Sequence, residues 1–101
     1  MSLLSQVSQA EIDSHLSEHP EWQIEGGELV RTFKFSTFSE AVTFVNRVAT
    51  LAEEAGHHPD IDIRYNRVRF ALVSHDAGGI TGKDLALAAG VDRLSAGFAA
   101  L

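Results

Sequence analysis

Apolar side chains recur along the chain with two spacings, one typical of helices and one typical of strands. Helical spacing predicts three helices: residues 8–18, residues from 36 or 37 to 55, and a last helix that starts near Thr81. The central helix has a wide apolar surface that can cover the sheet and also meet another subunit: Phe38, Ala41, Phe44, Val45, Val48, Leu51 and Ala52. The last helix has a stripe that we expect to be buried: Leu87, Val91, Leu94 and Phe98.

The ends of these helices have recognisable signals. Ser8 and Glu11 have the spacing of a capping box at the start of the first helix. That helix stops before Pro20, because the residue preceding a proline avoids the α region. Gly56 is a natural stop for the central helix.

Strand spacing predicts two hairpins. Residues 22–25 and 28–35 flank Gly26-Gly27, and two glycines supply the positive φ angles that tight hairpin turns need. In the second hairpin, apolar residues alternate with polar ones on both arms. A turn at Asn66-Arg67 pairs these residues on one face, as an antiparallel ladder requires. The predicted pairs are Tyr65 with Val68, Ile63 with Phe70, and Ile61 with Leu72.

The element order is therefore α-β-β-α-β-β-α. It predicts one α+β domain over residues 1–101, with a four-stranded antiparallel sheet and three helices on one face. No linker, repeat or low-complexity tract divides the chain.

Composition excludes several classes of function. The chain has no cysteine, so disulfides and thiolate metal sites are excluded. The net charge of −6 and the absence of a lysine/arginine cluster in the sequence argue against direct binding to nucleic acid. We see no signal peptide and no apolar run of the roughly 20 residues that span a bilayer, so we expect a cytoplasmic protein without a membrane contact.

The second hairpin also brings histidines together. Extended beyond Ile61 and Leu72, the predicted pairing brings His58 toward His75. Because Pro59 interrupts the ladder there, we predict only that the two histidines lie near each other. His57 is adjacent to His58. Histidine exchanges protons near neutral pH more readily than any other side chain, so these residues are candidates for acid/base chemistry.

Other polar residues have competing interpretations. Glu53 precedes His57 by four positions at the end of the central helix, where the two side chains can share a face. Asp84 follows Thr81 by three positions and suits either a capping box or a histidine partner. His15 and His19 have metal-ligand spacing but no evident third ligand, so we predict that they are surface residues.

The run Glu53-x-x-x-His57-His58-Pro59, followed by Tyr65, His75 and Asp84, resembles the signature of pterin-4a-carbinolamine dehydratases. A weaker similarity covers most of the remaining chain. It includes residues 4–12, Trp22 and Phe33-Lys34-Phe35.

The resemblance implies an activity. These enzymes remove water from 4a-hydroxytetrahydropterin, which aromatic amino acid hydroxylases produce, and release quinonoid dihydropterin. They need no metal or organic cofactor and form dimers or tetramers. The roles implied are catalytic for His57, His58 and His75, orienting for Glu53 and Asp84, and substrate-binding for Pro59 and Ser74.

Two other functions stay open at this stage. One is an interaction module, because some animal relatives also stabilise the dimer of a transcription factor; such an adaptor would not need the three histidines together. The other is a metal-binding protein that uses the same histidines. The sequence does not distinguish the acid from the base, the dimer from the tetramer, or one physiological pterin from another.

Overall fold

The computed structural model describes residues 5–98; Leu4, where the weaker resemblance begins, and the two ends of the expected domain lie outside this range. The elements in chain order are α1 (Gln9–Glu18), β1 (Gln23–Glu25), β2 (Glu28–Lys34), α2 (Phe38–Ala55), β3 (Asp60–Arg64), β4 (Arg67–Leu72), the short 3₁₀ helix η1 (His75–Ala77) and α3 (Gly82–Ser95). None of the helices in the described part is long and apolar enough to cross a membrane.

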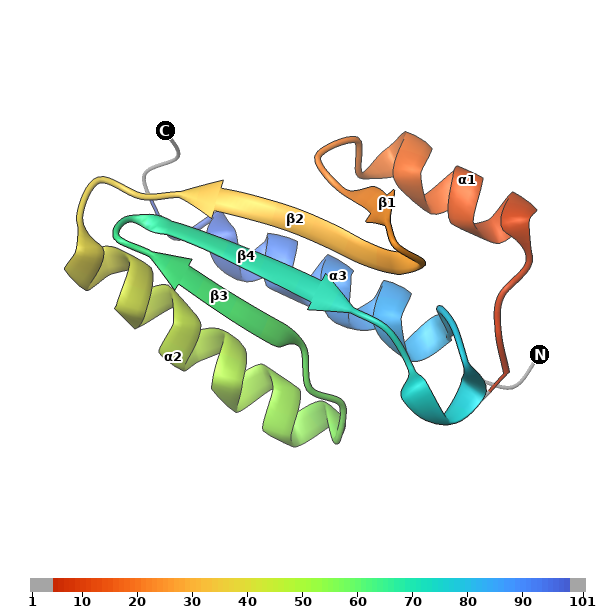
Figure 1. Cartoon of the computed structure of the whole chain (residues 1–101). Helices are drawn as coiled ribbons and strands as arrows, with labels where there is room; N and C mark the ends of the chain where they lie inside the picture. The colour runs from red at the N-terminus through yellow and green to blue at the C-terminus, as the bar shows by residue number, and fades with distance from the viewer. Residues whose placement is uncertain (1–4, 99–101) are drawn as a thin grey trace.

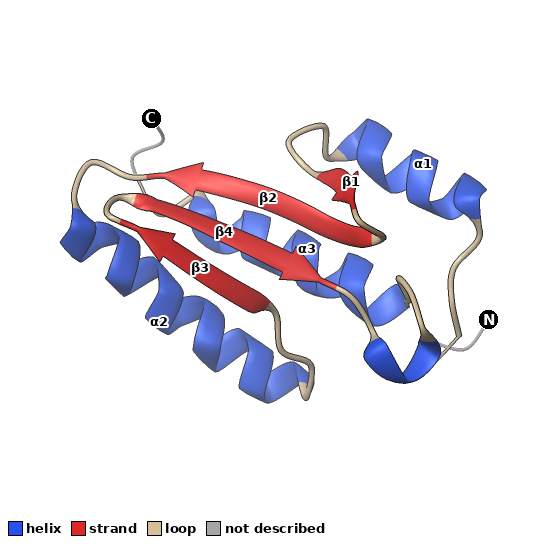
Figure 2. Cartoon of the chain, viewed as in Figure 1, coloured by secondary structure: helices blue, strands red, loops and turns tan. Residues whose placement is uncertain are grey.

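The four strands form one antiparallel sheet in the order β1-β2-β4-β3. Helices α2 and α3 lie behind this sheet in Figures 1 and 2, and no helix of residues 5–98 covers the opposite face. The predicted α+β class and element order are confirmed.

The core lies between the sheet and its helices. Phe44, Phe70 and Val91 are fully buried there, and the Phe44 ring packs edge-on against Phe70 with centroids 5.8 Å apart. The helix stripes supply most of the remaining contacts. Buried or partly buried as predicted are Ala41, Val45, Val48, Leu51 and Ala52 of α2, and Leu87, Leu94 and Phe98 in or after α3.

The predicted turns and caps are formed. Gly26 and Gly27 have φ angles of 57° and 80°, which is why glycine occupies the turn between β1 and β2. Ser8 accepts a hydrogen bond from the backbone N–H of Glu11, and the Glu11 carboxylate lies 3.5 Å from the Ser8 amide. A second capping box begins α3, between Thr81 and Asp84.

The predicted register of the second hairpin is wrong by two positions. Ile61 faces Phe70 and Ile63 faces Val68, and the turn consists of residues 65 and 66. A two-residue shift keeps every apolar side chain on its face, so alternation alone does not exclude it. The side-chain amide of Asn66 donates to the carbonyl of Phe35 at 2.7 Å, a contact from outside the hairpin that only this turn position makes.

Three apolar side chains of α2 and β3 are exposed. Phe38 is 52% exposed, because it is the first residue of α2, directly after the N-cap Thr37. Ile61 and Ile63 share a face with buried partners but are 37% and 39% exposed, because β3 is an edge strand.

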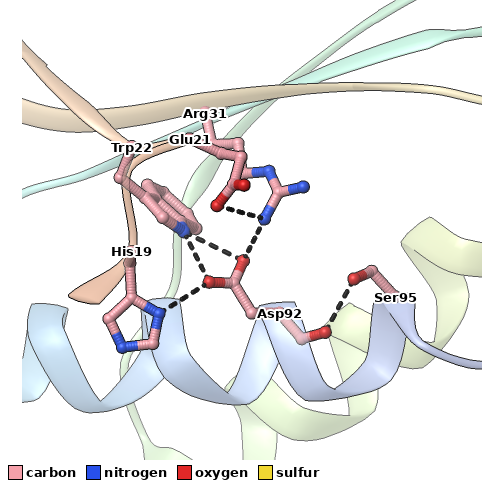
Figure 3. Close-up of polar contacts among 6 residues, drawn as sticks. All are labelled: His19, Glu21, Trp22, Arg31, Asp92 and Ser95. Carbon is pink, nitrogen blue, oxygen red and sulfur yellow. Dashed lines mark hydrogen bonds and ion pairs between the residues drawn. The ribbon is translucent and has the colours of Figure 1, made fainter. Parts of the chain in front are cut away.

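A polar cluster that the sequence did not reveal surrounds Asp92 on α3 (Figure 3). The indole N–H of Trp22 donates to its carboxylate at 2.9 Å, and Arg31 of β2 donates at 2.7 Å. The Nδ1 of His19 lies 3.1 Å from the other carboxylate oxygen. These bonds fasten the segment after α1 and the strand β2 to α3.

His15 belongs to the same region, so the prediction that His15 and His19 are surface residues is wrong. The two rings stack with centroids 4.3 Å apart, and both ring nitrogens of His15 are buried. Burial lowers the pKa of His15 below its usual 6.5, and the neighbouring His19 lowers it further. Asp92, Glu18 and the backbone of Leu85 act in the opposite direction but do not reverse the shift.

The lowered pKa of His15 predicts a loss of stability in acid. Below about pH 6.5 the unfolded chain binds a proton at His15 before the folded chain does, so the free energy of unfolding falls as the pH drops toward the lowered folded value. His15→Phe keeps an aromatic ring against His19 without this proton. Urea unfolding measured from pH 7.5 to 5 should show a shallower decline in His15→Phe than in the unmodified protein, and parallel curves would contradict the assignment.

Candidate active site

Four elements end or begin at the same end of the sheet. The C-terminal end of α2, the start of β3, the loop after β4 and the start of α3 converge there in Figure 1. The loop after β4 turns sharply, because Ser74 and Gly79 form an isolated bridge and Gly78 adopts a φ of 72°. Polar residues from distant parts of the chain therefore surround one location.

His57 is fixed by the end of α2. Gly56 caps this helix in the left-handed conformation, with a φ of 63° that favours glycine. The amide of His57 then donates to the carbonyl of Ala52 at 3.1 Å. This turn directs the His57 ring, 13% exposed, toward α3.

A buried carboxylate receives the His57 ring. Asp84 is 0% exposed, and its Oδ1 lies 2.5 Å from Nε2 of His57. Its Oδ2 accepts hydrogen bonds from the hydroxyl of Ser74 and from the backbone N–H of Thr81, both at 2.9 Å. Asp84 therefore caps α3 and contacts His57 at the same time, so its position is compatible with both interpretations.

The hydrogen bonds determine where the protons lie. Ser74 donates its only hydroxyl proton to Asp84, so the 2.8 Å contact between Ser74 and Thr81 requires that Thr81 donate to Ser74. Asp84 thus accepts two hydrogen bonds at Oδ2, and its Oδ1 contacts Nε2 of His57. This contact uses Nε2, so Nδ1 is the His57 ring nitrogen left for a bound molecule.

The other two histidines are more accessible. The Nε2 of His58 lies 2.6 Å from the Glu53 carboxylate, with side chains 62% and 75% exposed. The sequence suggested that Glu53 would lie beside His57. In the structure its carboxylate contacts His58 instead. His75 is exposed at the start of η1, where its carbonyl accepts from the amide of Gly78.

The three histidines line one hollow of about 270 Å³. The full lining is Gly56, His57, His58, Val73, Ser74, His75, Asp76, Ala77, Thr81 and Lys83. Continuing the observed pairing of Asp60 with Ala71 two residues outward sets His58 opposite position 73, so the hairpin register does not explain why His58 and His75 lie near each other. His75 reaches the hollow because η1 turns back.

The sequence-predicted residues divide into three groups. Ser74 lines the hollow, Glu53 and Asp84 contact its histidines from outside, and Pro59 is not part of its lining. Sequence reasoning missed Asp76 and Lys83, whose only sequence signal is their position beside His75 and Asp84. Within residues 5–98, no group of three or more histidine, cysteine or acidic side chains has an arrangement that could hold a metal ion.

Comparison with known sequences gives a consistent result. The model of the family described as pterin 4 alpha carbinolamine dehydratase matches residues 5–94. A protein of Chloroflexus aurantiacus is 57% identical over 90% of this chain and 98% of its own length. A protein of Acidobacterium capsulatum is 53% identical over 90% of this chain and 99% of its own length. Both are named, provisionally, pterin-4-alpha-carbinolamine dehydratases.

Two solved structures are similar in fold and sequence. A transcriptional coactivator/pterin dehydratase from Brucella melitensis superposes with a TM-score of 0.84 and 32% identity, over 89% of this chain and 98% of that one. A pterin dehydratase-like protein, identified as a RuBisCO assembly factor in the alpha-carboxysome, gives a TM-score of 0.60 and 29% identity. That match covers 73% of this chain and 86% of the other.

The double role of Asp84 predicts an unusually large loss of stability when it is removed. Asp84→Ala should lower the free energy of unfolding by about 2–4 kcal/mol, because it loses the cap and leaves the Ser74 hydroxyl and the Thr81 amide without an acceptor in a buried place.

Glu11→Ala is the matched control, because Glu11 holds the same capping-box position in α1 but is bonded only to exposed Ser8. Glu11→Ala should lower the free energy of unfolding by about 1 kcal/mol or less. Urea unfolding of both variants at neutral pH measures the difference. Equal losses would show that Asp84 is no more than a helix cap.

Proposed function

The chain belongs to the pterin 4 alpha carbinolamine dehydratase family, and we propose that it removes water from 4a-hydroxytetrahydropterin to give quinonoid dihydropterin. The observation that carries this proposal is the set of three imidazoles around one hollow, one of them held by a buried carboxylate. A volume of about 270 Å³ is just below the roughly 300–1,000 Å³ of drug-sized ligand pockets, which suits a small bicyclic ring.

The reaction needs two proton transfers. A proton must reach the 4a-hydroxyl so that the C4a–O bond breaks and water leaves. Another proton must leave N5, whose electron pair then forms the C4a=N5 double bond. Each transfer requires a positioned group that titrates near the working pH, and each typically contributes about 10²–10⁴-fold to the rate.

We assign these transfers to the accessible histidines. His58 and His75 are exposed and can exchange protons with both substrate and water. His57, fixed by Asp84, orients the ring system and presents Nδ1 to it. Glu53 holds His58, and Ser74 holds Asp84. The proposal uses no metal or organic cofactor, and we expect the substrate to come from an aromatic amino acid hydroxylase.

We also propose that the chain self-associates as a dimer or tetramer. Strands β1 and β3 leave both edges of the sheet unpaired, and free edges are normally covered or paired. The exposed apolar side chains Ile61 and Ile63 line one of these edges, and Phe38 is exposed at the start of α2.

A second function, binding of another protein, has support from the two solved structures, one of a transcriptional coactivator and the other of a RuBisCO assembly factor. An adaptor does not need His57, His58 and His75 around one hollow, so a dehydratase assay separates the two proposals. Both functions can coexist if their surfaces differ.

The catalytic assignment predicts large rate losses without unfolding. His58→Ala and His75→Ala should each lower the dehydration rate by about 10²-fold or more. The double variant should lose less than the product of the two effects, because groups that act as a unit are not additive. Both side chains are exposed, so the melting temperature should change little.

The measurement follows the dehydration of freshly generated 4a-hydroxytetrahydropterin together with thermal unfolding of each variant. His15→Phe is the control, since it removes an imidazole outside the hollow and should keep full turnover. Near-normal rates in both single variants would reject the assignment of the two histidines. No activity in the unmodified protein would reject the proposed function.

Self-association predicts a mass at least twice the 11.0 kDa of one chain in light scattering at micromolar concentration. Ile63→Glu places a charge on the β3 edge and should shift the population toward monomer. A monomeric unmodified protein at that concentration would contradict the proposal.

A further inference from the structure

The uncovered face of the sheet carries a concentration of positive charge. Alternate residues of each strand point away from the helices, and the register places Lys34 of β2, Arg67 and Arg69 of β4 and Arg64 of β3 on this face. These are four of the eight lysines and arginines in a chain with a net charge of −6. The cationic face is defined here by these four residues.

Three of these cations form a row across adjacent strands. Lys34 is directly paired with Arg67, and Arg67 is directly paired with Arg64. Like charges that face each other in a sheet destabilise it. Adjacent strands are about 4.8 Å apart, so the row spans about 10 Å. The fold alone gains nothing from this arrangement.

The chain neutralises this row only in part. Arg64 lies 3.3 Å from the Asp62 carboxylate, and Arg69 lies 3.3 Å from that of Glu25. Among the described residues, Lys34 and Arg67 form no ion pair, and both are exposed. Lys34 and Arg67, two adjacent members of the row, are therefore available to an external anionic group.

The surroundings of the row add shape and an apolar contact. A hollow of about 140 Å³ opens between the arginine side chains above Thr32 and Asp62. At the hairpin tip, Tyr65 is 70% exposed and has a φ of 52°, a conformation that is unfavourable for a bulky residue. Asn66 bonds to Phe35 and holds this turn in place. Tyr65, which follows Arg64 in the sequence, is thus exposed on an anchored turn at the end of the row.

We propose that the cationic face, together with Tyr65, binds an acidic segment of a partner protein. Arginine pairs carboxylates with two parallel hydrogen bonds, and Arg64 and Arg67 offer such pairs beside the ammonium group of Lys34. Exposed tyrosine beside arginine is the composition of energetically important interface residues.

The extent of the charge argues for a short segment over a long polyanion. On the same face, the end of the sheet away from the row of cations is acidic. Glu25 of β1 and Glu28 of β2 lie there, and Asp60 lies at the start of β3. A nucleic acid strand that followed the sheet would meet these carboxylates, whereas a short acidic peptide would end before them. This face also lies at the other end of the β3–β4 hairpin from the histidines, so both can be occupied together.

The test uses a short fluorescein-labelled peptide of glutamate with one central leucine, and the same peptide with glutamine in place of glutamate. Fluorescence anisotropy should show binding of the glutamate peptide alone, with affinity that falls as salt is added. Lys34→Ser combined with Arg67→Ser should weaken it about tenfold or more, and Tyr65→Ser should weaken it further.

Arg47→Ser combined with Arg93→Ser is the matched control, because it removes the same charge from α2 and α3 and should leave affinity nearly unchanged. Dehydration rates should stay the same in Lys34→Ser/Arg67→Ser, whose residues lie outside the histidine hollow. Melting curves of this variant should show no loss of stability, since a like-charge pair is removed.

Three results would overturn the proposal: equal losses of affinity in both double variants, equal binding of the glutamine peptide, or tighter binding of a single-stranded oligonucleotide or an anionic vesicle than of the acidic peptide. Because dehydration is measured separately, a negative binding result leaves the proposed enzymatic function unaffected.

Discussion

The contact between His57 and the buried Asp84 is the interaction on which this end of the molecule depends. A carboxylate with no exposed surface is stable only when its oxygens are fully hydrogen-bonded. His57, Ser74 and Thr81 provide those bonds from the end of α2, the loop after β4 and the start of α3. The arrangement of three elements is thereby set by one side chain, and the histidine hollow is formed where they meet.

Local features were predictable from sequence because their signals lie within one or two turns of the chain. The capping boxes at Ser8 and Thr81 join residues three positions apart. Gly56 ends α2 because its backbone adopts the left-handed conformation, which glycine tolerates best. The Asp92 cluster was not predictable, because its partners are 61 to 73 positions away and no periodicity links them. For Asp84 the sequence offered a histidine partner but did not say which histidine, because His57 lies 27 positions away.

The hairpin register shows a limit of a different kind. Hydrophobic alternation has a period of two, so it distinguishes the two faces of a strand but not two registers that differ by two residues. The predicted proximity of the histidines was right, although the hairpin register from which it was inferred was wrong. They meet because Gly78 and the bridge between Ser74 and Gly79 turn the loop back toward α2.

The unequal burial of the three histidines has an evolutionary consequence. His57 is bound into the network that begins α3, so its replacement disturbs the folded structure. His58 and His75 are exposed, and the core does not depend on them. If the proposed reaction is no longer selected for, these two residues can therefore change by neutral drift while the fold persists. Descendants of this architecture without the activity should retain the aspartate and its histidine longest, as a vestige maintained by selection for folding.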